Sequence, residues 1–218
     1  MAPSLRVERS LLSQHCTRLA CIDEVGRGAL AGPVTVGVVV LDQSVRPAPE
    51  GVRDSKLVPA AQREALVPRI EAWCASHAVA HATNDEIDAV GIIGALRMAG
   101  MRALALIDPP ADLVLLDGSH DWLTAPPATL FDSEHAPTPP VVTRVKADLD
   151  CTGVAAASIL AKVARDSLMS EAASRHPAFG WDRNKGYASA DHRAALRAHG
   201  PTPLHRVSWR LDGSSTGA

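Results

Sequence analysis

The sequence contains few cysteines, and their spacing excludes several kinds of site. Four cysteines occur in 218 residues, and no two of them form a Cys-x-x-Cys pair. A zinc knuckle, a redox motif and a disulfide scaffold are therefore not expected, and reduced thiols in a cytoplasmic enzyme are the simplest interpretation. The N-terminus also lacks a long apolar run, so we predict neither a signal peptide nor a transmembrane span.

Net charge is nearly absent, but acidic and basic residues are unevenly distributed. The formal net charge is -2. Residues 1–140 hold 11 Lys and Arg against 17 Asp and Glu, whereas residues 141–218 hold 11 against 7. A basic C-terminal third suits a phosphate backbone, and an acidic remainder suits a metal ion. The same imbalance also fits an ordinary solvated surface, so it does not identify a function alone.

Hydrophobic residues make up 46% of the chain, enough for a sizeable core in one domain. Short apolar runs predict strands near residues 19–22, 33–41, 78–82, 113–116 and 141–145. Helical patterns cover residues 59–75, 152–170 and 189–199. A further helix is expected to begin near Asn84, which can cap it. Pro68 is expected to kink or split the first of these helices. This order predicts an α/β fold with a partly parallel sheet.

The remaining segments carry no regular pattern. Residues 1–18 are predicted to be a polar lead-in, and residues 124–140, with five prolines, an irregular loop. Residues 212–218 are predicted to be a tail.

Four carboxylates are candidates for catalysis. Asp23 and Glu24 follow an apolar strand and precede a glycine turn, and Asp117 likewise stands between a strand and Gly118. A carboxylate at the end of a strand points into a cleft. Asp166 lies instead on the long helix. The alternatives are ordinary Asp-Gly turns and, for Asp166, an ion pair with Lys162 four residues earlier.

Several carboxylates brought together repel one another, and burial raises some of their pKa values. A hard divalent cation such as Mg²⁺ or Mn²⁺ removes this repulsion and can also bind a substrate phosphate. Asp23 and Glu24 point to opposite faces if their strand stays regular. A turn that begins at Glu24 would bring both to one ion.

A glycine turn is the first candidate for substrate binding. Gly26 and Gly28 flank Arg27, and such backbone can approach a sugar or phosphate closely. The turn has neither the Walker pattern nor the G-x-G-x-x-G spacing, so a nucleotide cofactor is not supported. Ser55 and Lys56, in a loop before a helix, offer a hydroxyl and a cation to phosphate, although a simple helix-entry turn is the favoured interpretation of this segment taken alone.

Aromatic residues make up only 3% of the chain, which gives the single tyrosine some weight. Tyr187 follows Lys185 and Gly186, and an exposed ring there can stack on a sugar or base while its hydroxyl contacts a 2′-OH. The alternative is a tyrosine packed under a loop. His192 is a candidate for proton transfer, or simply a histidine on a helix surface.

Taken in order, these segments resemble ribonuclease HII, the type 2 ribonuclease H family, from about residue 20 to residue 209. The matching stretches are Ile22-Asp23-Glu24-Val25-Gly26-Arg27-Gly28 with Ala31-Gly32-Pro33, Asp54-Ser55-Lys56-Leu57, Leu116-Asp117-Gly118, residues 155–166 (AAASILAKVARD), Lys185-Gly186-Tyr187 with His192, and His205-Arg206-Val207-Ser208-Trp209.

The resemblance implies a ribonuclease H-like fold in a single catalytic domain over residues 1–218. The core would span about 19–209, the helical C-terminal part about 170–210 and a flexible tail 211–218. It implies an endonuclease that uses Mg²⁺ or Mn²⁺ to cut the RNA strand of RNA–DNA hybrids and to cut at ribonucleotides embedded in duplex DNA. The products would carry 3′-hydroxyl and 5′-phosphate ends. The enzyme would act as a monomer in the removal of ribonucleotides and RNA primers.

The resemblance also assigns roles to residues. Metal binding and catalysis are implied for Asp23, Glu24, Asp117 and Asp166. Recognition of the ribonucleotide is implied for Gly26, Arg27, Gly28 and Tyr187, and further substrate contacts are expected from Ser55, Lys56, Lys146 and Lys185. The chain departs from the family pattern at Arg53 (commonly Asn), at Asn184 (commonly His), at Ala147-Asp148 (commonly Gly-Asp) and in its long proline-rich segment.

Three other interpretations compete with this one. A ribonuclease HIII-like enzyme would share the acids and the fold, but that type usually carries an extra N-terminal domain, and only about 20 residues precede the first strand here. A nucleic-acid-binding module without catalysis would not need all four acids. A structural metal-binding protein would leave the glycine turn and Tyr187 without a purpose.

Overall fold

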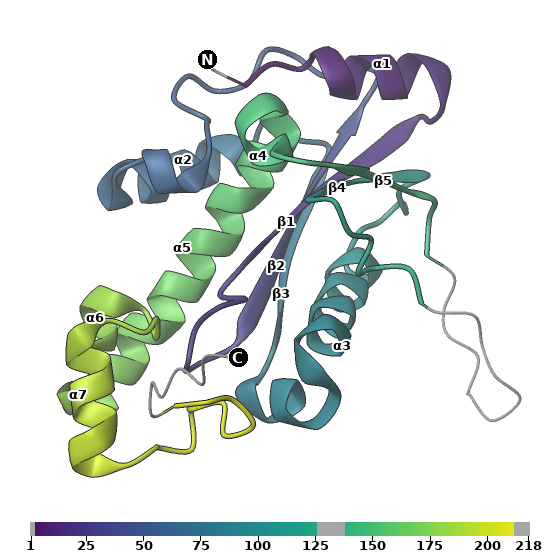
Figure 1. Ribbon diagram of the computed structural model, residues 1–218. Coiled ribbons are helices and arrows are strands. Elements are labelled where there is room, and N and C mark those ends of the chain that lie inside the picture. Colours follow the sequence, from purple (N-terminus) through teal and green to yellow (C-terminus); the bar gives the residue numbers. More distant parts are fainter. Residues whose placement is uncertain (1–2, 126–137, 212–218) are drawn as a thin grey trace, which may run out of the picture.

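A five-stranded mixed sheet lies between two long helices (Figure 1). The computed structural model describes residues 3–125 and 138–211. The strands are β1 (Arg18–Val25), β2 (Val34–Asp42), β3 (Ser76–Ala82), β4 (Leu113–Asp117) and β5 (Val141–Arg144). The helices of eight or more residues are α1 (Arg6–Gln14), α2 (Ala60–Glu71), α3 (Asn84–Ala105), α5 (Thr152–Arg175) and α7 (Ala190–His199). The predicted α/β class and partly parallel sheet are confirmed.

The sheet order β3-β2-β1-β4-β5 places β1 at the centre. β1 runs antiparallel to β2 and parallel to β4. In the parallel pair Ile22 lies opposite Leu116. The next residues, Asp23 and Asp117, therefore reach the same edge of the sheet side by side, because parallel strands end at a common edge.

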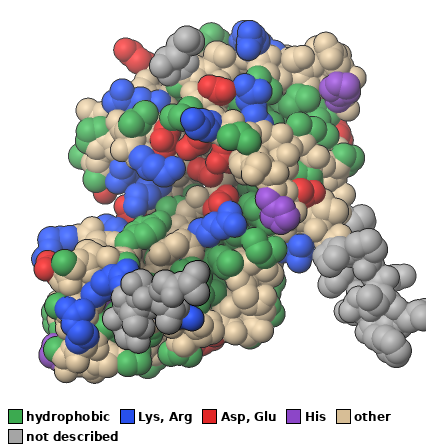
Figure 2. Space-filling view, in the orientation of Figure 1, with side chains coloured by type: hydrophobic (Ala, Val, Ile, Leu, Met, Phe, Trp, Pro, Cys, Tyr) green, Lys and Arg blue, Asp and Glu red, His purple; other side chains and the backbone are tan. Residues whose placement is uncertain are grey.

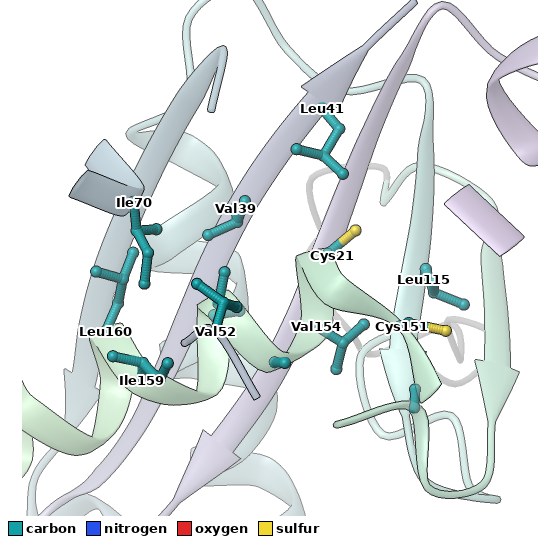
Figure 3. Packing of buried hydrophobic residues seen from close by; sticks show 14 of the residues in the cluster. Cys21, Val39, Leu41, Val52, Ile70, Leu115, Cys151, Val154, Ile159 and Leu160 are labelled. Atoms are coloured by element: carbon teal, nitrogen blue, oxygen red, sulfur yellow. The ribbon is translucent and has the colours of Figure 1, made fainter. Parts of the chain in front are cut away.

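Alternating side chains of β1 divide the core into two layers. Leu19 and Cys21 face α5, whereas Ala20 and Ile22 face α3. Figure 3 shows the first layer, with Cys21 packed among branched side chains of β2 and α5. A Cβ atom at Gly37 would overlap the backbone of Ala157. Glycine on β2 therefore lets α5 lie close against the strands.

The predicted polar lead-in is wrong, because residues 6–14 form helix α1. Leu12 of this helix is buried in the layer beneath α5. Glu8 is fully buried, and its Oε1 accepts a hydrogen bond from the N–H of Gly153, 2.7 Å away. The first N–H groups of a helix have no partner inside the helix. Glu8 thus caps α5 from a distant part of the chain.

Two predictions about helix boundaries also need correction. Pro68 does not split α2, which continues to Glu71, because a missing N–H near the end of a helix removes only one bond. The cap of α3 is Thr83, which forms a capping box with Glu86. α3 is interrupted instead at Gly91, where φ is 73°.

The C-terminal part is helical, as the resemblance implied. After α5 come the 3-10 turn η2 (Pro177–Phe179), α6 (Trp181–Asn184) and α7, which pack around a third apolar cluster. α4 (Ala147–Asp150) and η1 (Ser55–Leu57) are short elements near the N-terminal half of α5. Residues 126–137 and 212–218, predicted to be loop and tail, lie outside the described residues. None of the helices described is long and apolar enough to cross a membrane.

Candidate active site

Acidic side chains gather in the middle of the face shown in Figure 2, with Lys and Arg side chains around them. Asp23 on β1 is the most buried of the predicted carboxylates, with 6% of its surface exposed. Burial, followed by the charges of Glu24 and Asp117, raises its pKa well above the ordinary range. A hydrogen bond from Ser158 opposes this rise. The Ser158 hydroxyl in turn lies 2.8 Å from that of Ser55.

Glu24 alternates with Asp23 along β1, which runs on to Val25. The turn at Glu24 that would have brought both acids to one ion is therefore not present. Burial raises the pKa of Glu24, Arg27 opposes the rise, and the charge of Asp117 adds to it. The Arg27 guanidinium lies 3.5 Å from the Glu24 carboxylate. The other oxygen, Oε2, is buried without a hydrogen-bond partner among the described residues. The charge of Asp117 therefore acts on Glu24 as well as on Asp23, although the two side chains alternate along β1.

Asp117 ends β4 beside a fourth acid that the sequence analysis missed. Its Oδ1 accepts hydrogen bonds from the backbone N–H groups of Ala147, at 2.7 Å, and Asp148, at 3.3 Å. Burial raises the pKa of Asp117, and the charge of Asp148 raises it further. The Asp148 side chain is buried and lies 3.5 Å from the Lys56 amine.

Asp166 makes different contacts from the other three predicted carboxylates. It stands eight residues after Ser158 on α5, a rise of about 12 Å along the helix axis. Its oxygens lie 2.8 Å from the Lys162 amine and 3.6 Å from the Arg63 guanidinium. It lines a separate hollow of about 350 Å³ with Arg63 and Lys185. The ion pair that the sequence left open as an alternative is therefore the one observed.

The carboxylates do not form a ready-made metal cage. Across residues 3–125 and 138–211 no group of three or more His, Cys, Asp or Glu side chains is arranged to hold an ion. The donors are nevertheless those a hard cation prefers, because they are carboxylate oxygens in a partly dry place. The raised pKa values and the unpartnered Glu24 oxygen mark an excess of buried negative charge. The residues present therefore fit a divalent cation.

The glycine turn meets Tyr187 across 161 residues of sequence. The Gly26 N–H donates a hydrogen bond to the Tyr187 hydroxyl, 3.1 Å away. Gly26 has a φ of 87°, and a Cβ atom there would overlap the Arg165 guanidinium. Only glycine suits this position, because of both its backbone angle and the close side chain. The structure thus joins two segments that the sequence treated separately, and Tyr187 is 36% exposed.

Two buried arginines lie beneath this junction. Arg165 donates to the carbonyl groups of Pro33, Lys185 and Ala31, and its Cζ lies 5.4 Å from the centre of the Tyr187 ring. Arg206 donates to carbonyl groups of the turn itself.

The two predicted lysine contacts differ in their surroundings. Lys146 is exposed two residues before Asp148, with a left-handed φ of 59°. The Lys185 amine donates to the Ser170 hydroxyl and to the Asp182 carbonyl. Lys185 therefore lies on the side of the Asp166 hollow rather than beside Asp23.

His192 is neither on a helix surface nor placed for proton transfer, because it is fully buried. Its Nδ1 lies 2.9 Å from the Tyr187 carbonyl, and its Nε2 lies 3.0 Å from His205 Nε2. The Trp181 indole also donates to Nε2 of His192. The Thr202 N–H donates to His205 Nδ1, so this network needs both rings neutral.

Acid should destabilise the protein through these histidines. Burial and the neighbouring His192 lower the pKa of His205 to about 4, below the ordinary 6.5. The unfolded chain then binds a proton that the folded state excludes, so stability present above pH 6.5 is lost as pH falls toward 4. The slope is about 1.4 kcal/mol per pH unit for one proton. Urea unfolding at pH 7.5 and pH 5 should show about 2 kcal/mol of loss from His205.

His205→Gln should show a smaller loss between the two pH values, whereas the exposed His15→Gln variant should keep the loss of the unmodified chain. An equal loss in the His205 variant would contradict the prediction.

Comparison with known proteins agrees with this geometry. A family model described as Ribonuclease HII matches residues 20–212. Ribonuclease HII of Streptomyces avermitilis is 44% identical over 208 residues, which cover 95% of this chain and 83% of that protein. The crystal structure of ribonuclease H2 from Pyrococcus horikoshii has a TM-score of 0.67 at 26% identity, with 89% of this chain and 95% of that chain covered.

A structure of Bst-RNase HIII in complex with Mn²⁺ has a TM-score of 0.66 at 18% identity and covers 92% of this chain and 70% of that chain. At that identity the likeness shows the shared fold alone, whereas the family model and the sequence relative both name type HII. The chain belongs to the ribonuclease HII family and is an RNA–DNA hybrid endonuclease, a hydrolase of the ribonuclease H type.

Proposed function

We propose that this enzyme also cuts duplex DNA at single embedded ribonucleotides and leaves 3′-hydroxyl and 5′-phosphate ends. Its role would be removal of ribonucleotides and RNA primers from DNA in the cytoplasm. One observation carries the proposal: a single stretch, residues 23–28, supplies both the buried acids and the turn that meets Tyr187. The groups that would recognise the sugar therefore lie beside the carboxylates that would catalyse cleavage next to that sugar.

We assign the catalytic carboxylates as Asp23, Glu24, Asp117 and Asp148. These four would hold Mg²⁺ or Mn²⁺, whose chemistry is to activate water and to stabilise charge on a phosphodiester. The Ser158 hydroxyl, which lies 2.8 Å from that of Ser55, lowers the pKa of Asp23 and so favours its charged form. The backbone N–H groups of residues 147 and 148 hold Asp117 toward Asp148.

The glycine turn and Tyr187 would recognise the ribose. The Tyr187 oxygen accepts the Gly26 N–H, so its own O–H remains free to donate. The N–H groups of Arg27 and Gly28 have no acceptor among the described residues. A 2′-hydroxyl accepts such donors, whereas deoxyribose has no oxygen there. This arrangement supports discrimination between RNA and DNA at one nucleotide.

Lys56 would meet the phosphate. Burial lowers its pKa, but the charges of Asp54, Asp148 and Asp23 outweigh burial and raise it. The amine therefore stays protonated beside the acids, where it can offset the charge of a bound phosphate. This supports the expected phosphate contact of Lys56. The helix-entry turn is present as well, because Asp54 accepts the Lys56 N–H at the start of η1, and Ser55 is buried with its hydroxyl 2.8 Å from that of Ser158.

The decisive experiment is cleavage of a DNA duplex that carries one ribonucleotide, with and without Mg²⁺ or Mn²⁺. We expect a single cut next to the ribonucleotide that requires the cation, and product ends that a ligase or phosphatase assay identifies as 3′-hydroxyl and 5′-phosphate. Cleavage of a full RNA–DNA hybrid without cleavage of the single-ribonucleotide duplex would overturn the proposal that the enzyme cuts at single embedded ribonucleotides.

Tyr187→Ala should lower cleavage at a single embedded ribonucleotide by about tenfold or more, and binding to plain duplex DNA by much less. The reason is loss of both the ring and the hydroxyl that contacts Gly26. Tyr187→Phe is the matched control for the hydroxyl, since it keeps the ring near Arg165. Measurements of cleavage and of DNA binding test this. Equal losses in both would count against a role in reading the sugar.

A further inference from the structure

Arg206 contacts two carbonyl groups of the glycine turn and the carbonyl group of Gly32. It is fully buried, 179 residues after Arg27 in sequence. Its Nη2 donates to the Gly26 carbonyl at 2.7 Å, and its Nη1 to the Arg27 carbonyl at 2.9 Å. Nε and Nη2 both donate to the Gly32 carbonyl at 3.1 Å. The five N–H donors of a guanidinium have a fixed geometry, so these carbonyl groups are held in one arrangement.

These contacts also set the direction of two amide groups. In a trans peptide the C=O and the following N–H point in opposite directions. Both peptide bonds of the turn are trans. The carbonyl groups of Gly26 and Arg27 point at the buried guanidinium, so the N–H groups of Arg27 and Gly28 point away from it. A Cβ atom at Gly28 would meet nothing within 4 Å, so the turn is open in that direction.

The guanidinium itself is fixed by its neighbours. The Trp209 ring lies 4.8 Å from its Cζ, within the range of a cation–π interaction. The Arg206 N–H donates to the Leu30 carbonyl, and His205 forms a bridge with Ala31. The C-terminal segment is thus tied to the chain immediately after the turn.

We propose that Arg206 is a positioning residue for sugar recognition: it turns the Arg27 and Gly28 amides toward the ribose and so sets the preference for a ribonucleotide. This inference rests on the proposed reading of the 2′-hydroxyl by the turn. It assigns the strength of the preference to a side chain that does not touch the substrate.

The test compares binding of two duplexes without divalent cation, so that no cleavage occurs. One duplex carries a single ribonucleotide, and the other is the same sequence entirely in DNA. Fluorescence anisotropy gives the ratio of the two Kd values. In Arg206→Lys this preference should fall about tenfold relative to the unmodified chain, because one amine cannot serve three carbonyl groups. Binding of the all-DNA duplex should change less than twofold.

Arg102→Lys is the matched control, because Arg102 donates to a carbonyl and to Glu86 far from the turn in sequence. It should keep the full preference. If Arg206→Lys does not fold, Trp209→Leu takes its place. It removes the ring over the guanidinium and keeps an apolar side chain against the neighbouring clusters, and a loss of preference of about threefold is expected.

An unchanged preference in a folded Arg206→Lys or Trp209→Leu variant would overturn the positioning role. A preference absent from the unmodified chain would overturn the reading of the sugar as well, so the two failures are distinguishable. A drop in Arg206→Lys equal to that in Arg102→Lys would show a general loss of stability and would also overturn the inference.

Discussion

Asp23→Asn is expected to reduce cleavage of a duplex that carries one ribonucleotide at least a thousandfold, while the protein becomes more stable rather than less. The loss follows from removal of one negative ligand from the acidic group. The gain follows from burial, which raises the pKa of Asp23 together with the charges of Glu24 and Asp117. Asparagine keeps an oxygen that can accept the Glu24 N–H, 2.8 Å away, without the buried charge.

The pH dependence of stability distinguishes the relief of a buried charge from an unspecific change in stability. A carboxyl with a raised pKa holds its proton longer in the folded state, so the unmodified chain should lose stability as pH rises from about 4. Asp23→Asn removes that loss. Thermal unfolding at pH 5 and pH 8 without divalent cation should therefore show a larger gain at pH 8.

Asp42→Asn is a control with the opposite sign, because hydrogen bonds from Ser44 lower the pKa of Asp42. That variant should be less stable at neutral pH and should cleave normally. Cleavage by Asp23→Asn at the rate of the unmodified chain would remove Asp23 from the site.

Asp148→Asn should also abolish cleavage, whereas Asp166→Asn should lower it less than tenfold. Asp148 lies against Asp117 and within 3.5 Å of the Lys56 amine. Asp166 is instead engaged by Lys162 and Arg63. Both substitutions remove one charge from one aspartate, so the pair separates a position in the acidic group from a position in an ion pair.

Single-turnover cleavage in Mg²⁺, with circular dichroism to verify the fold, measures the difference. A large loss in Asp166→Asn with a small loss in Asp148→Asn would reverse the assignment. A similar loss in both would mean that the ion pairs on α5 contribute as much as the fourth carboxylate.

The edge of the sheet where the acids meet could be predicted from sequence, because it depends on local patterns. Asp23 and Asp117 each follow a buried strand, and parallel strands bring such residues together. Asp148 does not follow a buried strand, so no pattern of this kind marks it in the sequence. It reaches Asp117 only because the N–H groups of residues 147 and 148 donate to that carboxylate across about 30 residues of sequence.

The contacts of Asp166 could not be predicted, for a related physical reason. Helical periodicity indicates which side of α5 a residue occupies, but not which strand residue lies opposite it along the axis. The position of a residue along the α5 axis relative to the sheet is set by packing, such as the close approach of Gly37 to Ala157. The capping of α5 by Glu8 could not be predicted for the same reason, since the donor and acceptor are 145 residues apart.

The meeting of the glycine turn and Tyr187 was predicted only as a shared role implied by resemblance. Their contact depends on the buried arginines 165 and 206, whose donors satisfy backbone carbonyl groups from several segments. A sequence pattern does not show where a long polar side chain will be enclosed, because such residues are usually exposed.

The cap that Glu8 provides also limits how the protein can be shortened. A variant that begins after residue 14 would still contain every residue assigned to cleavage. Its α5 would nevertheless start with an uncovered Gly153 amide, and the apolar surface that Leu12 covers would be exposed. Ser158 and Arg165 lie on that helix. Trimming the N-terminus for crystallisation or fusion would therefore disturb catalysis from a place remote from the chemistry.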